Sequence, residues 1–144
     1  MSAFLLDVNV LVALVRSKHS HHEPAKRWFS AAGSRQWATC PLTQAGFVRV
    51  VSNPRFTAQT VDVREALQML TELTGLPGHE FWPVDFDVAT AVTPFASRFF
   101  GHQQVSDVYL LALAMRNRGK LATLDRGLAF LAGDEFAAKV VLIG

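Results

Sequence analysis

The stretch AFLLDVNVLVALVRS, residues 3–17, decides the fold class. Its first four residues (3–6) form a short apolar run, which is typical of a strand that is covered on both faces. The segment 8–17 then has the pattern of a helix and follows the strand without a linker. Asp7 lies between the two apolar runs, where a lone charge is costly unless it has a function. This stretch therefore predicts a buried strand that delivers an acid to the start of a helix.

The same alternation continues along the chain. Short apolar runs predict further strands at 37–40, 81–84, 121–124 and 140–143. Helical patterns and their start and stop signals predict further helices at 21–33, 42–53, 61–75, 87–100 and 106–119. Alternating strands and helices indicate an α/β fold with a mainly parallel sheet and helices on both faces. The 144 residues contain no linker or repeat, so we expect one domain, 1–144.

Three details of the predicted helices can be checked against a structure. Pro94 predicts a kink or a break in the segment 87–100, because proline removes a helical hydrogen bond. Ser106 is the expected N-cap of the helix 106–119, and Gly119 is its expected stop signal.

Composition and charge limit the possible partners and compartments. The net charge is only +2, and ten of the fourteen cationic residues are Arg, which permits a nucleic-acid partner without requiring one. Cys40 is the single cysteine, so an internal disulfide is impossible and a reducing compartment is expected. The chain shows no secretory signal and no apolar run of about 18 residues, the length a membrane helix needs. We therefore expect a cytoplasmic protein that does not enter a membrane.

Polar residues follow the predicted strands where a parallel sheet places its ligands. Asp7 ends the first strand, Asp125 follows the fourth, and Asp107 opens the helix 106–119. Gln44 lies just after the second strand. In doubly wound sheets, ligands bind beyond the carboxyl ends of the strands. The sequence therefore predicts that three carboxylates and one amide gather at one edge of the sheet.

Such a cluster has a simple chemical use. Two carboxylates about 4 Å apart repel by roughly 4 kcal/mol at an effective dielectric constant near 20, so the cluster must protonate, spread apart or bind a cation. Oxygen ligands without a thiol or imidazole favour Mg²⁺ or Mn²⁺. A metal held in this way serves hydrolysis of a phosphodiester. Each acid also has an ordinary interpretation, since Asp107 suits the first turn of any helix and Asp125 suits a turn. The shared location favours the functional interpretation.

Four motifs together resemble a known family. They are LLDVNVLVAL (5–14), TQAGFVRV (43–50), VSDVYLLALA (105–114) and LATLDRGL (121–128). In this order, and over nearly the whole chain, they look like a PIN domain and, more closely, like the VapC-type ribonuclease toxins of bacterial toxin–antitoxin modules. The resemblance implies a compact three-layer α/β/α sandwich with a five-stranded parallel sheet. It also implies Mg²⁺- or Mn²⁺-dependent cleavage of RNA, a homodimer, and inhibition by a cognate antitoxin.

The resemblance also assigns roles to individual residues. The family's metal-binding acids match Asp7, Asp107 and Asp125, and Asn9 matches a small polar position that supports the site. The departure is Gln44, because many family members have Glu at this position. Glutamine retains an acceptor oxygen but loses the charge and any role as a general base. We therefore expect Gln44 to orient water or a ligand, or to cap the helix, and we expect metal binding to rest on three acids.

Further polar residues are candidates for RNA contact or for metal binding. Arg49, Arg55 and Arg126 fall near the predicted site, and Thr123 shares a strand with Asp125; these are the expected phosphate contacts. His102, in the loop before Asp107, has the pattern of an ordinary loop histidine. The remaining cluster, His19, His21 and His22, does not match a common zinc spacing and is expected to be structural or exposed.

Two other functional classes remain open on the sequence. A PIN-like module that binds RNA or protein without cutting would explain the uncharged Gln44, and such a module should bind no metal at this edge. A phospho-receiver domain would use one strand-end Asp as phosphoacceptor. It would, however, need adjacent acids near the start and a Lys after the last strand, and this chain has neither. The preferred hypothesis is a metal-dependent endoribonuclease.

Overall fold

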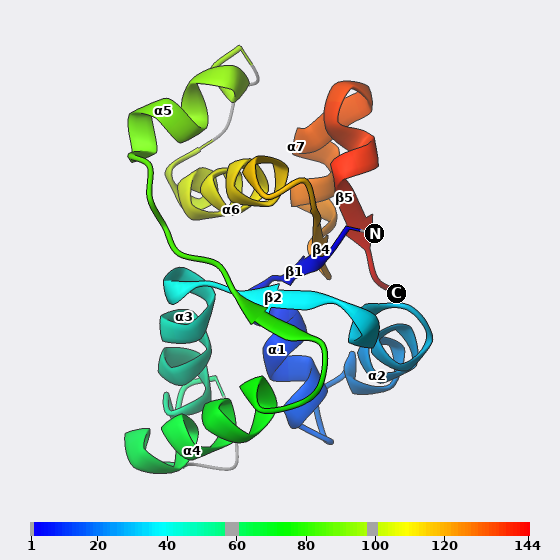
Figure 1. Cartoon of the computed structure of the whole chain (residues 1–144). Helices are drawn as coiled ribbons and strands as arrows, with labels where there is room; N and C mark the ends of the chain where they lie inside the picture. The colour runs from blue at the N-terminus through cyan, green and yellow to red at the C-terminus, as the bar shows by residue number, and fades with distance from the viewer. Residues whose placement is uncertain (1, 57–60, 98–100) are drawn as a thin grey trace.

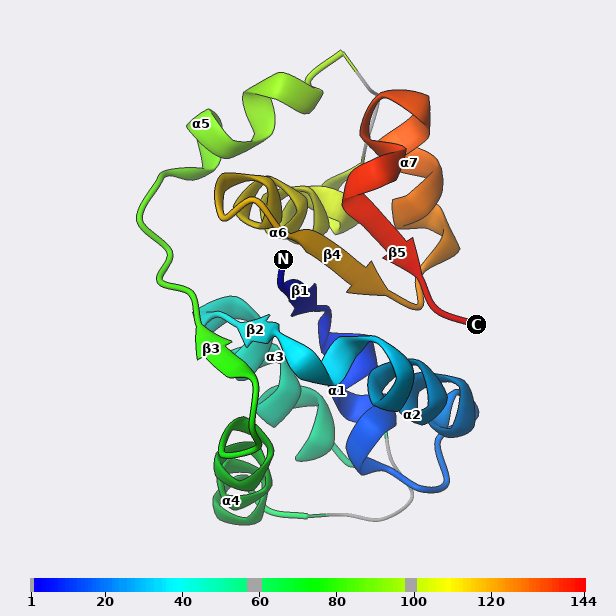
Figure 2. The same ribbon diagram turned by 45° about the vertical axis from the view of Figure 1, so that its right-hand side comes forward.

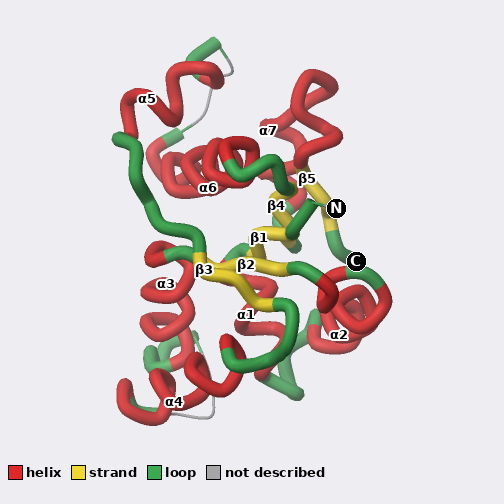
Figure 3. The backbone as a smooth tube through the Cα atoms, in the orientation of Figure 1, coloured by secondary structure: helices red, strands yellow, loops and turns green. Residues whose placement is uncertain are grey.

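A five-stranded sheet forms the middle layer of the computed structural model, which describes residues 2–56, 61–97 and 101–144 (Figure 3). Its strands are β1 (Phe4–Leu6), β2 (Trp37–Thr39), β3 (His79–Phe81), β4 (Lys120–Thr123) and β5 (Val140–Leu142). Their order across the sheet is β3-β2-β1-β4-β5, and every neighbouring pair is parallel. The predicted parallel α/β architecture is confirmed.

Helices cover both faces of this sheet (Figures 1 and 2). Their bounds are α1 (Val8–Val15), α2 (His22–Ala31), α3 (Pro41–Val51), α4 (Val63–Thr74), α5 (Val88–Val92), α6 (Val105–Arg116) and α7 (Arg126–Phe136). Short 3₁₀ helices lie at Gly33–Arg35, Thr93–Phe95, His102–Gln104 and Ala137–Lys139. One core cluster joins the sheet to α5, α6 and α7, and the other joins it to α1, α3 and α4. The three layers are therefore helix, sheet and helix.

The strand order places a crevice between β1 and β4. The chain runs outward from β1 through β2 to β3, then returns to add β4 and β5 on the other side of β1. The two strands flanking this reversal pair directly, with Leu5 opposite Leu121. Their helices leave on opposite faces, because α1 packs in one core cluster and α7 in the other. In open parallel sheets this reversal is where ligands bind, beyond the carboxyl ends of the two strands.

The third strand lies earlier than the sequence indicates. We predicted 81–84, whereas β3 spans His79–Phe81 and pairs with β2. Trp82 follows the strand and is buried in the core cluster of α6, so its apolar character serves packing rather than strand pairing. Pro83 then lacks the N–H that a further ladder bond requires. The apolar run at 81–84 therefore marks the exit from the sheet.

Several helix boundaries also differ from their predictions. The segment 87–100 is helical only over α5 and then becomes a 3₁₀ turn at Thr93–Phe95, which confirms the break predicted from Pro94; its last three residues lie outside the described ranges. The prediction omitted α7, because its short apolar pattern is interrupted by Gly127 and Gly133, and Gly133 has a non-helical conformation. Ser106 is not the N-cap of α6. That helix begins at Val105, with Gln104 as its cap.

The end of α6 shows why glycine stands at 119. The left-handed backbone position belongs to Arg118, with φ 58°, so Gly119 is not the residue that stops the helix by its conformation. A Cβ on Gly119 would lie 2.4 Å from the carbonyl oxygen of Ala3. That oxygen accepts a hydrogen bond from the Lys120 amide, at 3.0 Å. Glycine is therefore needed here for the close approach of the chain entering β4 to the chain entering β1.

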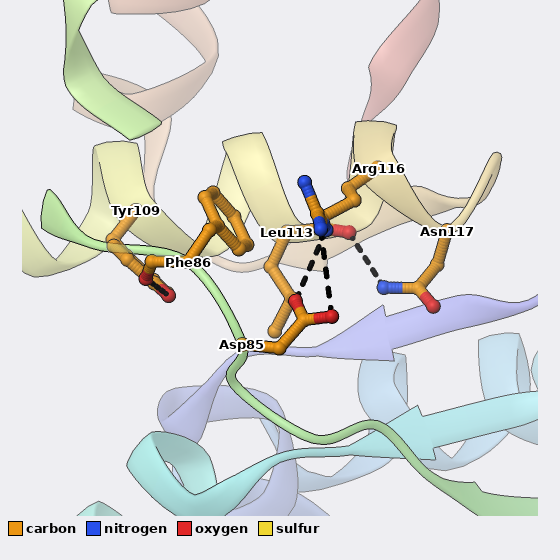
Figure 4. A network of polar contacts seen from close by, with 6 residues as sticks. All are labelled: Asp85, Phe86, Tyr109, Leu113, Arg116 and Asn117. Atoms are coloured by element: carbon orange, nitrogen blue, oxygen red, sulfur yellow. Dashed lines mark hydrogen bonds and ion pairs between the residues drawn. The ribbon is translucent and has the colours of Figure 1, made fainter. Parts of the chain in front are cut away.

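Helix α6 carries Asp107 and is tied to the segment after β3 (Figure 4). The Tyr109 hydroxyl donates to the Phe86 carbonyl at 2.6 Å, and the two rings stack with centroids 4.9 Å apart. Arg116 forms an ion pair with Asp85 at 3.0 Å and lies over the Phe86 ring. Because the ion pair is exposed, it adds little stability. The aromatic stacking and the hydrogen bond of Tyr109 therefore hold the segment after β3 against α6.

Among the helices in the described ranges, none is both long and apolar enough to cross a membrane.

Candidate functional site

Asp7 reaches its position because β1 ends at Leu6 and α1 begins at Val8. It is the N-cap of α1, and its Oδ1 accepts a hydrogen bond from the Val8 amide at 2.8 Å. Its other oxygen, Oδ2, accepts from the Thr123 hydroxyl at 2.7 Å. Only 7% of Asp7 is exposed, and this burial raises its pKa against the opposing effect of the two hydrogen bonds. Asp7 is thus both a cap and a buried acid at the crevice between β1 and β4.

Thr123 links the ends of the two central strands. Its buried hydroxyl donates to Asp7 and accepts from the backbone amide of Asp125 at 3.1 Å. It also lies 3.5 Å from the side-chain nitrogen of Asn9. The Asn9 side-chain oxygen in turn accepts from the Leu124 amide at 3.3 Å. Thr123 is fully buried, so it does not present its hydroxyl to RNA as the sequence suggested. It orients Asp7 beneath the surface, and Asn9 supports the loop that follows β4.

Asp125 lies two residues beyond β4 and caps α7. Its Oδ1 accepts from the Gly127 amide at 2.8 Å, which leaves the second carboxylate oxygen without a bond to the helix start. Unlike Asp7, Asp125 is exposed. The turn interpretation and the functional one are therefore compatible, because only one oxygen is used by the turn.

Asp107 lies in the first turn of α6 and is half-buried. Burial, followed by the charges of Asp7 and Asp125, raises the pKa of Asp107 to about 7. The same electrostatic coupling appears at Asp7, whose pKa is raised further by Asp125. The structure therefore brings the three predicted acids within electrostatic range of one another, although they come from three separate elements. We call Asp7, Asp107 and Asp125 the acid rim.

A cavity of about 310 Å³ lies at the acid rim. Another cavity, of about 340 Å³, lies away from the three acids and is lined by residues of β1, α2 and the segment before β2. The cavity at the rim is lined by Gly101, His102, Gln104, Asp107, Asp125 and Gly127. Two of the three acids thus face one open space between the starts of α6 and α7. His102 also lines it, although its sequence context predicts an ordinary loop histidine. Its only sequence signal is its position five residues before Asp107.

Gln44 is not the cap of α3. The N-cap is Cys40, whose amide donates to the Thr43 hydroxyl at 3.0 Å. The Gln44 side-chain nitrogen instead donates to the Thr39 hydroxyl at 2.9 Å, and that hydroxyl lies 2.7 Å from His79 Nε2. Gln44 is therefore held on the β2–β3 side of the carboxyl edge, with its carbonyl oxygen left for another partner.

The predicted RNA-contacting arginines lie in different places. Arg126 is exposed at the first position of α7, directly beside Asp125. Arg49 is exposed in the last turn of α3, eight residues from its start, which corresponds to about 12 Å along the helix axis. Arg55 follows still further along the chain, after α3 has ended. Of these three arginines, Arg126 adjoins the acid rim. Helix α3 leads away from the carboxyl edge of the sheet, so Arg49 at its end and Arg55 beyond it are not next to the acids.

The histidine cluster at 19–22 has local partners. The His22 ring bonds the Ala13 carbonyl at 2.7 Å, which ties the start of α2 to α1, and His19 Nδ1 accepts from the His21 amide at 3.0 Å. These contacts agree with the structural role predicted for the cluster.

The carboxylate oxygens of the acid rim suit a hard divalent cation that takes some of its ligands from the protein and the rest from water. In the part of the chain that the structure describes, no three His, Cys, Asp or Glu side chains lie close enough together to hold an ion among themselves. Mg²⁺ usually binds through one or two carboxylates and keeps several waters, so three direct ligands are not required. The oxygen-only chemistry and the electrostatic coupling of the acids therefore fit Mg²⁺ or Mn²⁺, with water completing the shell.

Replacing Asp107 by Asn is expected to stabilise the metal-free protein above about pH 6. Because the folded-state pKa is raised to about 7 from 3.8, the folded chain binds more protons than the unfolded chain between these values. Wild-type stability therefore falls as the pH rises through this window, whereas that of the variant does not. Since Asp107 is half-buried and screened by water, we expect a gain of roughly 2–4 °C in Tm, equivalent to about 1 kcal/mol. Thermal unfolding in EDTA at pH 4 and pH 8 measures it.

The pH 4 measurement is the control, since both proteins should then unfold at the same temperature. Equal Tm values at pH 8 would contradict the raised pKa of Asp107.

Comparison with known proteins places these features in a family. The model of the PIN domain matches residues 4–133. Ribonuclease VapC38 of Mycobacterium tuberculosis is 41% identical over 139 residues, which cover 96% of each chain. Ribonuclease VapC39 of the same species is 42% identical over 125 residues, covering 87% of this chain and 90% of the relative. Ribonuclease VapC29 is 43% identical over 131 residues, covering 90% and 91%.

Solved structures with low sequence identity share the fold. A toxin–antitoxin complex from Klebsiella pneumoniae matches with a TM-score of 0.64 at 20% identity, covering 97% of this chain and 96% of the other. FitAcB from Neisseria gonorrhoeae matches with a TM-score of 0.62 at 22% identity, covering 90% and 92%. At these identities the likeness concerns the fold, which agrees with the strand order described above.

Proposed function

The chain belongs to the PIN-domain family and, within it, to the VapC ribonuclease toxins of toxin–antitoxin systems, and on this premise we propose that its acid rim hydrolyses RNA with a bound divalent cation. The observation that carries the proposal is the convergence of Asp7, Asp107 and Asp125 at the reversal of strand order. Burial, followed by repulsion from Asp7 and Asp125, raises the pKa of Asp107, and a bound cation would relieve both effects.

Each acid has a separate structural support. Asp7 is fixed by Thr123 and by the Val8 amide, so its carboxylate cannot turn away from the crevice. Asp125 is fixed through one oxygen by the Gly127 amide. Asp107 needs no such bond, because its position in the first turn of α6 aims it at the cavity it shares with Asp125. These supports orient the carboxylates before a ligand arrives, which lowers the cost of assembling the site.

We assign metal binding to Asp7, Asp107 and Asp125, directly or through water. Mg²⁺ or Mn²⁺ held there would neutralise charge on the substrate phosphate and activate water for attack at phosphorus. Arg126, exposed beside Asp125, is placed to bind a neighbouring phosphate of the RNA. Gln44, with its nitrogen engaged by Thr39, would orient water or substrate through its carbonyl oxygen.

Partners and location form a further part of the proposal. The structural relatives include toxin–antitoxin complexes, which supports an antitoxin as the protein partner of this chain. We also propose a homodimer and a cytoplasmic location, and the buried free Cys40 is compatible with a reducing compartment.

The test is cleavage of single-stranded RNA by the purified protein. With Mg²⁺ or Mn²⁺ we expect cleavage, with an excess of EDTA none, and recovery when the metal is restored. Cleavage that survives complete chelation would contradict the metal-dependent mechanism, and absence of cleavage with either metal would contradict the function.

Gln44→Glu is expected to tighten Mg²⁺ binding. The change adds a negative charge in the first turns of α3, at the same edge of the sheet as the acids. One added charge at about 10 Å attracts a divalent cation enough for a roughly three- to tenfold gain in affinity at low ionic strength. Calorimetric titration with Mg²⁺ measures the gain, and Gln68→Glu, on the exposed face of α4, is the matched control. An unchanged affinity with a lower Tm would show that Gln44 serves only to hold Thr39.

A further inference from the structure

Phe130 has no role in the core. It is 89% exposed, whereas the next most exposed large apolar side chain among residues 2–56, 61–97 and 101–144, Phe56, is 69% exposed. Its neighbours on α7, Leu128 and Leu131, are buried against the sheet. An aromatic ring left in water gains nothing from folding, so its exposure needs another explanation.

The position of Phe130 relates it to the acid rim. Helix α7 begins directly after Asp125, and Gly127 lines the cavity that Asp107 and Asp125 share. Phe130 follows Gly127 by three residues and Arg126 by four, so all three lie on one face of the helix. One helical turn is about 5.4 Å long, and the ring therefore stands one turn from the edge of the cavity. This is about the spacing between neighbouring nucleotides of an extended strand.

Arg126 supplies an exposed cation at the start of α7, directly after the N-cap Asp125. The divalent cation proposed for the acid rim would offset the charge of Asp125, and the first turn of α7 contains no further acidic residue. Asp134 and Glu135 follow only after Gly133, where φ 58° and ψ −165° interrupt the helix. The face between Asp125 and Gly133 thus combines a cation with a bare aromatic ring. Proteins that bind single-stranded nucleic acid use this combination, since the cation holds the phosphate and the ring stacks on a base.

We propose that Phe130 forms a base-stacking subsite for single-stranded RNA next to the acid rim, with Arg126 on the intervening phosphate. The inference rests on the proposed ribonuclease function and extends it, because it states how the substrate strand leaves the cavity. The occupant is RNA rather than a protein helix, because Phe130 is the only exposed large apolar side chain within α7 and stands beside the exposed cation Arg126. A docked amphipathic helix would need a row of apolar residues at this face.

The subsite predicts a particular kinetic signature. Stacking of a base on an aromatic ring contributes about 1–3 kcal/mol, which corresponds to roughly 5- to 150-fold in affinity. Since the ring contacts a base away from the reacting phosphate, the interaction is the same in the ground state and the transition state. Its loss should raise KM and leave kcat unchanged.

The first experiment measures cleavage of a short single-stranded RNA by Phe130→Ala, Phe130→Trp and the control Phe56→Ala, which removes an exposed ring after α3. We expect KM to rise about tenfold for Phe130→Ala with kcat within twofold. Phe130→Trp should keep the wild-type KM, and Phe56→Ala should match the wild type. Introducing one abasic nucleotide should raise KM for the wild type and have no further effect on Phe130→Ala. An unchanged KM for Phe130→Ala, with an active wild type, would overturn the subsite but leave the ribonuclease function intact.

A second measurement does not depend on cleavage. RNA containing 2-aminopurine loses fluorescence when the base stacks, so binding to Asp7→Asn protein should quench it and binding to the Asp7→Asn, Phe130→Ala double variant should not. Equal quenching by both proteins would overturn the inference. So would a change in oligomeric state for Phe130→Ala by light scattering, because it would assign the ring to a second copy of the chain. Weaker binding of an antitoxin with unchanged RNA binding would also overturn it.

Discussion

Asp7→Asn is expected to lower metal-dependent RNA cleavage by at least about 100-fold, since even residues that only orient metal ligands cost 10- to 100-fold when changed. Asparagine keeps the shape and an oxygen for the Val8 amide, so the cap of α1 is preserved. Its amide nitrogen would face the Thr123 hydroxyl, which already accepts from the Asp125 amide and would lose the carboxylate oxygen that accepts its proton. The change therefore removes the negative charge of Asp7 and also weakens its link to Thr123, so the Tm of the variant is measured together with its activity. Initial rates on single-stranded RNA with Mg²⁺ measure the loss.

The matched control is Asp87→Asn. Asp87 also caps a helix, accepting from the Thr90 amide at 2.7 Å, but it stands at the start of α5 and is fully exposed. Its replacement should leave the cleavage rate within twofold. Wild-type activity in Asp7→Asn would refute the assignment of the acid rim. Loss of activity in both variants would show that the assay reports stability instead.

Gly78→Ala is expected to be among the most destabilising single substitutions in the described chain. Gly78 has φ 86°, a left-handed conformation that costs other residues roughly 1–2 kcal/mol. A Cβ would also lie 2.3 Å from the Ser34 carbonyl oxygen and 2.8 Å from that of Arg35. Forcing an extra carbon into a packed site typically costs a further 1–3 kcal/mol. The two effects together predict a loss of about 3 kcal/mol in the free energy of unfolding.

The hydrogen bonds around Gly78 explain why the substitution would also disturb the pairing of β2 with β3. The Gly78 carbonyl accepts from the Trp37 amide at 3.0 Å, and the carbonyl of Pro77 accepts from the Trp37 indole at 3.3 Å. Displacing this turn would separate β3 from β2. Urea unfolding measures the effect, and Gly101→Ala is the control, because nothing lies within 4 Å of a Cβ there. Equal stability of the two variants would contradict the steric argument.

Local sequence signals were sufficient for the architecture. Alternating apolar runs and helical patterns gave a parallel sheet covered on both faces, because burial on both faces requires continuous apolar strands. They were insufficient at 81–84 and over α7. At the first, Trp82 is apolar for packing in the helix layer rather than for the sheet. At the second, glycines at 127 and 133 weaken the helical pattern, although burial of Leu128 and Leu131 stabilises the helix.

The sequence likewise predicted part of the candidate site and missed another part. The three acids could be found from the sequence, because each directly follows a strand or opens a helix, and parallel strands direct those ends to one edge. The tertiary structure decided what surrounds them. Thr123 proved to be a buried link between Asp7 and Asp125, Arg49 lies at the far end of its helix, and His102 lines the cavity.

The sequence by itself thus determined the fold class and the family, and it predicted the acids of the site, because these depend on local periodicity and on the order of short motifs. Only the tertiary structure decided that Gln44 bonds Thr39 rather than capping α3, that burial and then the charges of Asp7 and Asp125 raise the pKa of Asp107 to about 7, and that Phe130 stands one turn from the cavity. The physical reason is that hydrogen-bond partners, burial and electrostatic coupling depend on distances between residues that are far apart in the chain.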